Sequence, residues 1–216
     1  MPTKGLSDVF DRDSVSAARV RADAQQSIYA PGDEDDAMYL IESGQVKLSM
    51  SSAGGQDCLL AIYTAGEVFG ESCFTGTRKR FESATAMQPT VVRRASRREF
   101  LAEVHRAGGI DVLVRHLALR LGDRQTAVFE LVTMDAAKRL AKVLLDFAEK
   151  FGVEEGTFLR VEQRISHEEL SQIVGTTRPR ITAFMQRFRR LGIVEDSGPR
   201  SISIDRGKAK EFLDRE

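Results

Sequence analysis

The pattern of apolar and polar positions changes character along the chain, and its first part predicts strands. Between residues 25 and 100, short apolar runs such as MYLIESGQVKLSM and CLLAIYTAGEVFG alternate with turns rich in Gly and Asp. Short strands separated by such turns are typical of an antiparallel sandwich or roll. The glycines that mark the corners are Gly32, Gly44, Gly54, Gly55 and Gly66. We therefore predict an antiparallel β-roll over residues 25–109, after a polar N-terminal segment at residues 1–24.

From Ile110 onward the apolar period becomes helical, which predicts a long helix over residues 110–134. Its stripe is long and narrow, as in the seam of a coiled coil between two chains. The residues expected at this interface are Ile110, Leu113, Leu117, Leu121, Val128 and Leu131. Arg124 interrupts the stripe, and a polar residue in a seam often sets its register. The alternative is a single helix packed on the roll.

Residues 165–195 have the pattern of a helix-turn-helix. Ser166 and Glu169 form a capping box, and Gly175 suits the positive φ at a helix end. Pro179 falls in the first turn of a second helix, where no backbone N–H is needed. The apolar side of that helix is expected to consist of Ile181, Phe184, Met185, Phe188 and Leu191. The opposite side is cationic and hydrogen-bonding, which suits a helix lying in a DNA major groove.

The segments around this motif complete a winged C-terminal domain over residues 135–216. Asp135 is expected to cap a helix at residues 136–151, and a strand is expected at residues 158–161. Residues 201–204 alternate polar and apolar side chains and could pair in a hairpin wing, and Asp205 could cap a last short helix. The predicted class is α+β: an N-terminal antiparallel β-roll, a long dimerisation helix, and a C-terminal winged helix-turn-helix.

Composition narrows the functional classes. The chain has 216 residues, 42% hydrophobic and 30% charged, which describes a globular protein. No apolar run approaches the length of a membrane span, and the N-terminus lacks an apolar signal core, so we expect a cytoplasmic protein. Two cysteines, Cys58 and Cys73, are too few for a disulfide framework or an iron–sulfur cluster. The acidic run at residues 33–36 is interpreted as a solvated turn rather than a cation site.

The net charge of zero conceals an uneven distribution. Residues 136–216 carry 16 Lys and Arg against 13 Asp and Glu, whereas residues 1–135 carry 16 against 19. The basic residues concentrate between Arg178 and Arg200, where six arginines lie near only two acidic residues, Glu195 and Asp196. A locally basic surface favours nucleic-acid binding through the phosphates that it contacts.

In this order, the segments resemble the cyclic-AMP receptor protein/FNR family of bacterial transcription regulators over about residues 25–205. The resemblance depends on Gly32-Asp33, on YLIESGQVKL at Tyr39–Leu48, on GEVFGES at Gly66–Ser72, and on the helix-turn-helix. It implies a roll similar to cyclic-nucleotide-binding domains, a homodimer, and a two-fold related site on double-stranded DNA. RNA polymerase and a small-molecule effector are the further partners that it implies.

The resemblance also implies which residues meet DNA. Arg178 would take a guanine through two hydrogen bonds. Many members carry Glu at the next position, where this chain has Pro179, so base preference there departs from the family. Arg180 and Thr182 are the next candidates for base edges. Phosphate contacts or exposure to solvent are expected of Arg187, Arg189, Arg190 and Arg200, and Thr176 and Thr177 can cap the helix and also reach a phosphate.

The effector pocket departs further from the family. Members that bind a cyclic nucleotide carry Gly-Glu and then an Arg directly before Ser/Thr-Ala, and that Arg neutralises the phosphate. This chain has Glu82 at that position, and a carboxylate repels a phosphate, so we do not expect cyclic AMP to bind. Arg124 and Gln125 stand where those members place small hydroxyl residues. The candidate pocket residues are Gly70, Glu71, Ser72, Arg80, Glu82, Ser83, Arg124 and Gln125.

The resulting hypothesis is a homodimeric, sequence-specific transcription regulator that responds to an unidentified signal and needs no metal. The alternatives are a cyclic-nucleotide-responsive regulator, a redox- or haem-sensing regulator that uses Cys73, and a ligand-binding protein that does not bind DNA. An enzyme is not expected, because the sequence has no nucleophile elbow, Walker loop, zinc signature or Gly-rich dinucleotide turn.

Overall fold

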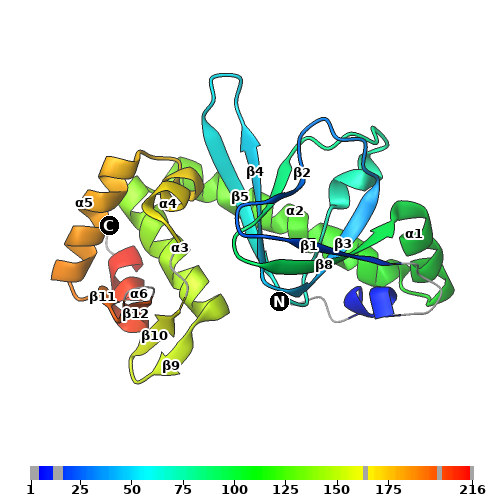
Figure 1. The fold of residues 1–216 in the computed structure, drawn as a ribbon. Helices are drawn as coiled ribbons and strands as arrows, with labels where there is room; N and C mark the ends of the chain where they lie inside the picture. The colour runs from blue at the N-terminus through cyan, green and yellow to red at the C-terminus, as the bar shows by residue number, and fades with distance from the viewer. Residues whose placement is uncertain (1–4, 12–16, 163–164, 199–200, 215–216) are drawn as a thin grey trace. The chain divides into compact units, whose positions relative to one another are not determined.

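A computed structural model describes residues 5–11, 17–162, 165–198 and 201–214 (Figure 1). The chain divides into two compact units, Met1–Arg124 and Gln125–Glu216. Helix α2 (Ile110–Thr133) crosses this boundary, whereas the sequence pattern treated residues 110–134 as a segment of their own. Among the described residues, no helix is both long enough and apolar enough to cross a membrane.

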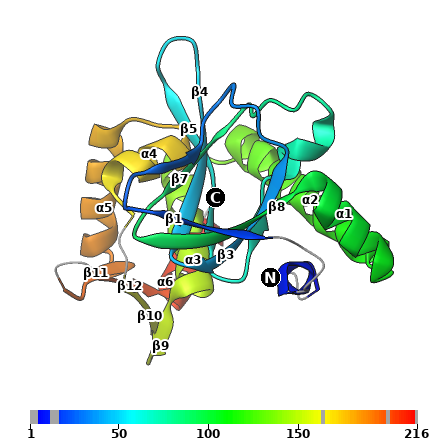
Figure 2. The same cartoon turned by 45° about the vertical axis from the view of Figure 1, so that its right-hand side comes forward.

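The N-terminal unit is built on two four-stranded antiparallel sheets (Figure 2). The first has the order β1 (Ala18–Ala22), β8 (Thr90–Ser96), β3 (Ala37–Ser43), β6 (Val68–Phe69). The second has the order β2 (Ser27–Tyr29), β7 (Ser83–Ala86), β4 (Gln45–Ser51), β5 (Asp57–Thr64). The predicted roll is confirmed. It begins earlier than expected, because β1 pairs with β8 along its whole length.

Two apolar clusters hold this unit together. One is aromatic and contains Tyr39 stacked on Phe69, with ring centroids 5.0 Å apart. The other joins the first sheet to two short helices, η1 (Ser7–Asp11) and α1 (Arg97–Arg106), through a contact between Phe10 and Phe100. A 3-10 segment, η2 (Glu71–Thr75), follows β6.

Helix α2 presents two different faces in the N-terminal unit. Leu113 and His116 are buried, and Leu113 belongs to the cluster around Phe10 and Phe100. The prediction that Leu113 lies in the seam between two chains is therefore wrong, because its own chain already covers it. The remaining apolar residues of the stripe are exposed, as with Leu121 at 60% and Val128 at 61%.

The C-terminal unit packs three helices against a small sheet, with α3 (Ala136–Phe151) providing the largest apolar face. Asp135 caps α3 as expected, accepting hydrogen bonds from the backbone of Ala137 and Lys138. The sheet has the order β11 (Val194–Asp196), β12 (Ile202–Asp205), β10 (Phe158–Val161), β9 (Val153–Glu155). Asp205 lies at the start of α6 (Arg206–Asp214) and accepts from the backbone of Lys208.

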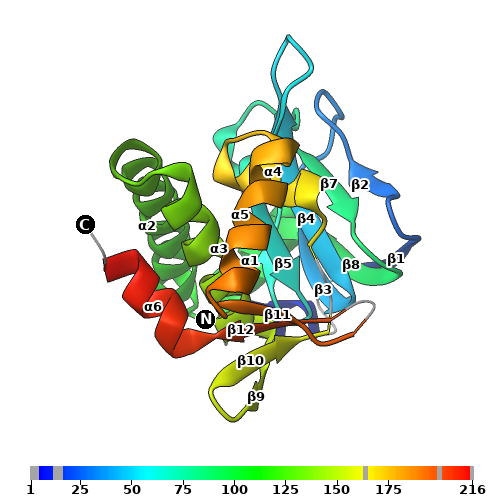
Figure 3. The same cartoon turned by 90° about the vertical axis from the view of Figure 1, so that its left-hand side faces the viewer.

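The helix-turn-helix consists of α4 (His167–Val174) and α5 (Arg178–Arg190), and Figure 3 looks onto α5. The capping box of Ser166 and Glu169 is present in both directions, and Gly175 has φ 67°. Ile181, Met185 and Phe188 are buried on the inner side of α5. Leu191 was expected on this side, but it is exposed, because α5 ends at Arg190 and Leu191 follows it in the turn.

We predict that Ser166→Ala destabilises α4 by about 1 kcal/mol, because two backbone N–H groups at the helix start depend on this capping box. The measurement is amide hydrogen exchange of α4 in the full chain. Ser197→Ala removes an exposed hydroxyl of the same unit and should leave the exchange of α4 unchanged. Equal effects of the two substitutions would contradict the assigned role of Ser166.

Candidate functional site

The outer side of α5 is a cationic surface. Arg178, Pro179, Arg180, Arg187 and Arg190 are all exposed. The guanidinium of Arg180 lies 5.6 Å from the ring centre of Phe184, and that of Arg187 lies 5.3 Å from the ring centre of Phe212. These stacked contacts orient the side chains and leave their charges uncompensated. The arrangement can bind phosphates and the edges of bases.

Several predicted DNA-contacting residues have partners within the chain. Arg189 forms a two-pronged ion pair with Asp196, at 2.9 and 3.2 Å, so its charge is partly neutralised. The Thr182 hydroxyl donates to the Arg178 carbonyl at 3.2 Å and lies 3.0 Å from Nδ1 of His167. With both positions occupied, Thr182 is a weaker candidate for reading a base than Arg178 or Arg180.

The two threonines of the turn differ from each other. The hydroxyl of Thr176 is buried and has no hydrogen-bond partner among the described residues, so in this conformation it does not face a phosphate. Thr177 is the N-cap residue of α5. Its side chain is exposed and makes no capping hydrogen bond. Its hydroxyl therefore remains available. Arg200, predicted to contact phosphate, lies outside the described residues.

Arg139 of α3 is a residue that the sequence pattern did not single out. Its Nε donates to the carbonyl of Val174 at 2.9 Å, and its Nη1 donates to the carbonyl of Met134 at 2.6 Å. The last carbonyls of a helix lack partners within the helix. Arg139 satisfies one of them at the end of α4 and so fixes the turn that leads into α5. Nothing in the local sequence connects residues that are 35 positions apart.

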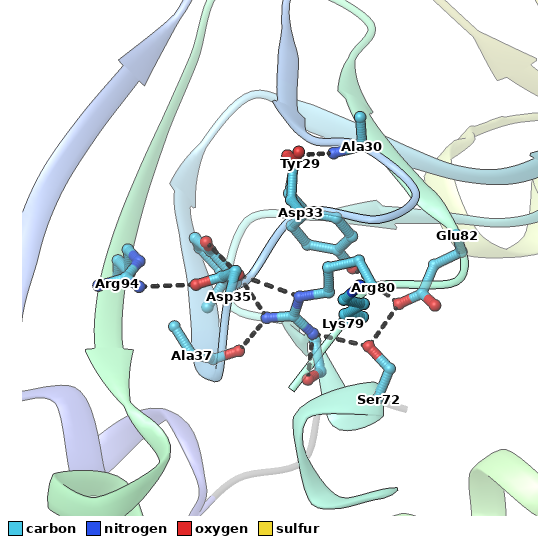
Figure 4. Close-up of polar contacts among 12 residues, drawn as sticks. Tyr29, Ala30, Asp33, Asp35, Ala37, Ser72, Lys79, Arg80, Glu82 and Arg94 are labelled. Carbon is cyan, nitrogen blue, oxygen red and sulfur yellow. Dashed lines mark hydrogen bonds and ion pairs between the residues drawn. The ribbon is translucent and has the colours of Figure 1, made fainter. Parts of the chain in front are cut away.

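In the roll, Arg80 is fully buried and all of its donors are used (Figure 4). Nε and Nη2 donate to Asp35 at 3.0 and 2.6 Å. Nη1 donates to the Gly70 carbonyl and to Ser72, and Nη2 also donates to the Ala37 carbonyl. A guanidinium has five N–H groups, and here five acceptor contacts account for them. Arg80 therefore cannot bind a further anion without losing an internal bond.

Asp35 is the counterion of Arg80, although the sequence pattern assigned it to a solvated turn. It also accepts from Arg94 at 2.6 Å and from the Tyr39 hydroxyl at 2.8 Å. Burial alone would raise the pKa of Asp35, but the hydrogen bonds from Arg80, Arg94 and Tyr39 outweigh it and lower that pKa below its usual value. The carboxylate therefore stays ionised and holds both arginines.

Glu82, which was expected to repel a cyclic phosphate, is buried in the roll. One carboxylate oxygen accepts from Ser72 at 2.8 Å and from the Tyr29 hydroxyl at 3.1 Å. The other is buried without a partner among the described residues. Burial and the negative charge of Glu82 raise the pKa of Tyr29 far above its usual value, so its hydroxyl remains a donor.

Of the remaining pocket candidates, some make contacts within the chain and others are exposed or half-buried. Glu71 accepts from Nε of Arg120 at 3.2 Å and lies 2.7 Å from Nε2 of His116, both on α2. Arg124, interpreted as a residue that sets the register of a seam, instead donates to the Leu60 carbonyl of its own chain. Gln125 is exposed, and Ser83 lies half-buried on β7.

Gly70 lies close against β3 for a steric reason. Its φ is 102°, and a Cβ there would lie 2.8 Å from the Ala37 carbonyl oxygen. Only glycine allows the backbone to approach β3 this closely, which places the Gly70 carbonyl on Arg80. Of the candidate pocket residues, the structure thus brings Gly70, Ser72, Arg80 and Glu82 together.

The cysteines do not form a reactive pair. Cys73 is buried, and burial raises the pKa of its thiol to about 12, so little thiolate forms at neutral pH. Cys58 is exposed on β5. Among the described residues, no group of three or more His, Cys, Asp and Glu side chains is arranged to hold a metal ion.

Two family models match the two halves of the chain. The model of the cyclic nucleotide-binding domain matches residues 19–107, and that of the Crp-like helix-turn-helix domain matches residues 138–209. Among solved structures, a CooA mutant from Carboxydothermus hydrogenoformans has a TM-score of 0.77 at 26% identity, covering 97% of this chain and 90% of that one. FixK2 from Bradyrhizobium japonicum, at 21% identity, has the same fold with a TM-score of 0.76, covering 94% and 99%.

The curated relatives are transcription regulators. A "CRP-like cAMP-activated global transcriptional regulator" of Mycobacterium tuberculosis is 32% identical over 83% of this chain and 80% of its own length. A "Global nitrogen regulator" of Synechococcus elongatus is 28% identical over 76% and 75%. With both domain models matched and a relative of this similarity, the chain belongs to the CRP/FNR family of transcription regulators, with a cyclic-nucleotide-binding-type roll and a helix-turn-helix that binds DNA.

Proposed function

We propose that this chain is a homodimeric regulator that reads a two-fold related DNA site through α5 and does not respond to cyclic AMP. The observation that carries the proposal is the exposed cationic side of α5, with Arg178 at its N-terminal end. Base contacts in the major groove come from the first residues of a recognition helix, and phosphate contacts fix its register. Two such helices, about one helical turn apart along the DNA, would read the two half-sites.

The apolar stripe of α2 supports the homodimer. Leu121, Val128 and Val132 are 60%, 61% and 79% exposed, although they recur at helical spacing. A contiguous apolar surface of this kind marks an interaction site, and a heptad-like stripe pairs best with a second copy of itself. Covering it with the partner's α2 would bury Ile110, Leu117 and Leu131 as well.

The polar arrangement of the roll argues against cyclic AMP as the signal. A cyclic phosphate needs a donor-rich cation, but Glu82 presents a carboxylate and all five N–H groups of Arg80 have acceptors within the chain. Binding through Arg80 would require its guanidinium to leave Asp35. That change costs the desolvation energy of a buried charge that has lost its partner.

A cyclic-nucleotide-responsive regulator is the second candidate. It is favoured by the match to the cyclic nucleotide-binding domain and by the name of the relative from Mycobacterium tuberculosis, which is cAMP-activated. A calorimetric titration with cyclic AMP separates the two candidates directly. The redox alternative has less support, because the raised pKa of Cys73 disfavours its thiolate.

Arg178→Ala should weaken binding to the specific site by about 1–3 kcal/mol and relax the preference at one base pair in each half-site. The reason is the loss of a bidentate contact to guanine. Fluorescence anisotropy with a set of single-base variants of the site measures both effects. Lys210→Ala removes one exposed charge from α6 of the same unit and serves as the control. An equal loss for specific and random DNA would assign Arg178 to phosphate instead.

Leu121→Asp should dissociate the dimer, because it places two like charges in an apolar seam. DNA affinity should fall with it, since a single head cannot span both half-sites. Analytical ultracentrifugation gives the oligomeric state. Thr126→Asp adds the same charge to an exposed position on the opposite side of α2 and should leave the dimer intact. A dimer that persists in Leu121→Asp would place the interface elsewhere.

The wild-type chain should show no binding of cyclic AMP at micromolar concentrations, and its affinity for DNA should not change when cyclic AMP is added. Calorimetry tests the first outcome and anisotropy the second. The relative named "Cyclic AMP receptor protein" from Thermus thermophilus, 30% identical to this chain, is the positive control. Micromolar binding accompanied by a rise in DNA affinity would establish the second candidate.

A further inference from the structure

A cavity opens between the two sheets of the roll, at the edge formed by β1 and β2. Its volume is about 440 Å³, within the range of sites that hold small molecules. The first sheet contributes Val20 and Tyr39 to its lining, and the second contributes Ile28 and Tyr29. Neither Glu71 nor Glu82, two of the residues that the sequence pattern singled out, lines this cavity.

The rim of this cavity carries both signs of charge. Asp33 and Glu34 are exposed carboxylates on the turn between β2 and β3. Arg94 lies on β8, and its side chain is 40% exposed. Nη2 of Arg94 donates to Asp35. A guanidinium has five N–H groups, so Arg94 has further donors for a ligand. A molecule in the cavity would therefore meet acceptors on one side, donors on another, and apolar atoms between them.

The acidic turn is held rigidly enough to present these groups. The backbone N–H of Asp35 donates to the carbonyl of Arg78, and the N–H of Arg80 donates to the carbonyl of Asp33. One oxygen of Asp33 also accepts from the backbone of Ala30 at 2.8 Å. A carboxylate has about four acceptor sites, so Asp33 can accept from a ligand without releasing Ala30.

The floor of the cavity is connected to α2 through a series of contacts, of which Figure 4 shows those from Asp35 to Ser72. Asp35 at the floor holds Arg80, and Arg80 holds Gly70 and Ser72, which flank Glu71. Glu71 in turn contacts His116 and Arg120 of α2. A ligand that draws Arg94 away from Asp35 would change the charge balance at one end of this set.

We propose that this cavity binds an α-amino acid with an aliphatic side chain. Its carboxylate would pair with Arg94, its ammonium group with Asp33 and Glu34, and its side chain would pack on Val20 and Ile28. A ligand with a single charge would use only one part of the rim. The inference deepens the proposed function, on which it rests, by giving the roll an effector of a defined class at a second location.

Calorimetry with the full-length wild-type chain tests the ligand class. The probes are L-leucine, L-valine and L-isoleucine, together with two single-charge analogues of leucine, 3-methylbutylamine and 4-methylpentanoate. We expect at least one amino acid to bind in the millimolar range or tighter, and both analogues to bind more weakly than leucine. The proposal is overturned if no amino acid binds, or if an analogue binds as well as leucine.

Two variants locate the site. Glu34→Gln removes an exposed rim charge and should weaken amino-acid binding about fivefold without affecting the fold. Arg94→Gln should weaken it at least as much. Glu42→Gln changes a carboxylate of β3 that pairs with Arg19 and does not line the cavity, so its affinity should match the wild type. Binding that survives Glu34→Gln and Arg94→Gln unchanged would place the amino acid elsewhere.

DNA affinity measured with and without the bound amino acid separates this inference from the proposed function. A change in affinity supports an effector role, and binding without any change overturns that role. If the chain binds DNA specifically but binds no amino acid, only the cavity proposal fails. If it binds no specific DNA under any condition, the proposed function fails, and calorimetry still decides whether the cavity takes an amino acid.

Discussion

The buried ion pair of Arg80 and Asp35 determines what the roll can do. The Arg80 side chain has no exposed surface and that of Asp35 is 10% exposed, so neither charge can be solvated if the other leaves. Removing one partner of such a pair typically destabilises a protein by about 3–5 kcal/mol. The pair joins the turn before β3 to the segment before β7. The guanidinium carbon of Arg80 also lies 4.3 Å from the centre of the Tyr29 ring. Because separating this pair is costly, we expect a signal that acts on the roll to leave the pair intact.

The same constraint divides the interior of the roll into two environments. On one side, Ser72, Glu82 and the Tyr29 hydroxyl form a chain of hydrogen bonds in which the acceptor capacity exceeds the donors. On the other side, Asp35 and Arg94 face the cavity at the β1–β2 edge. The two environments therefore differ in polarity within one pair of sheets, because Arg80 and Asp35 lie between them.

Local patterns predicted the elements well, and contacts between distant segments less well. The capping box at Ser166, the positive φ of Gly175 and the cap at Asp135 are properties of a few consecutive residues, and the structure contains all three. Asp35, Arg124 and Arg139 each have a partner that lies 35 to 64 residues away along the chain. No periodicity encodes such pairings. The prediction that Leu113 lies at the dimer interface was wrong for a related reason. A helical stripe does not show which of its residues are covered by the same chain.

The recognition helix α5 contains both residues that are bonded within the protein and arginines that are exposed. Arg189 is paired with Asp196 and Thr182 is bonded on both sides, so these two fix the position of α5 in its own unit. Arg178, Arg180 and Arg190 are exposed and form no ion pair with any residue in the described part of the chain. A base contact favours a side chain that has no internal hydrogen bond or ion pair to break on binding DNA. Where such an internal bond is lost, its free energy offsets that of the new contact. The residues without internal ion pairs are therefore the ones suited to reading sequence, and those with them are suited to holding the helix in place.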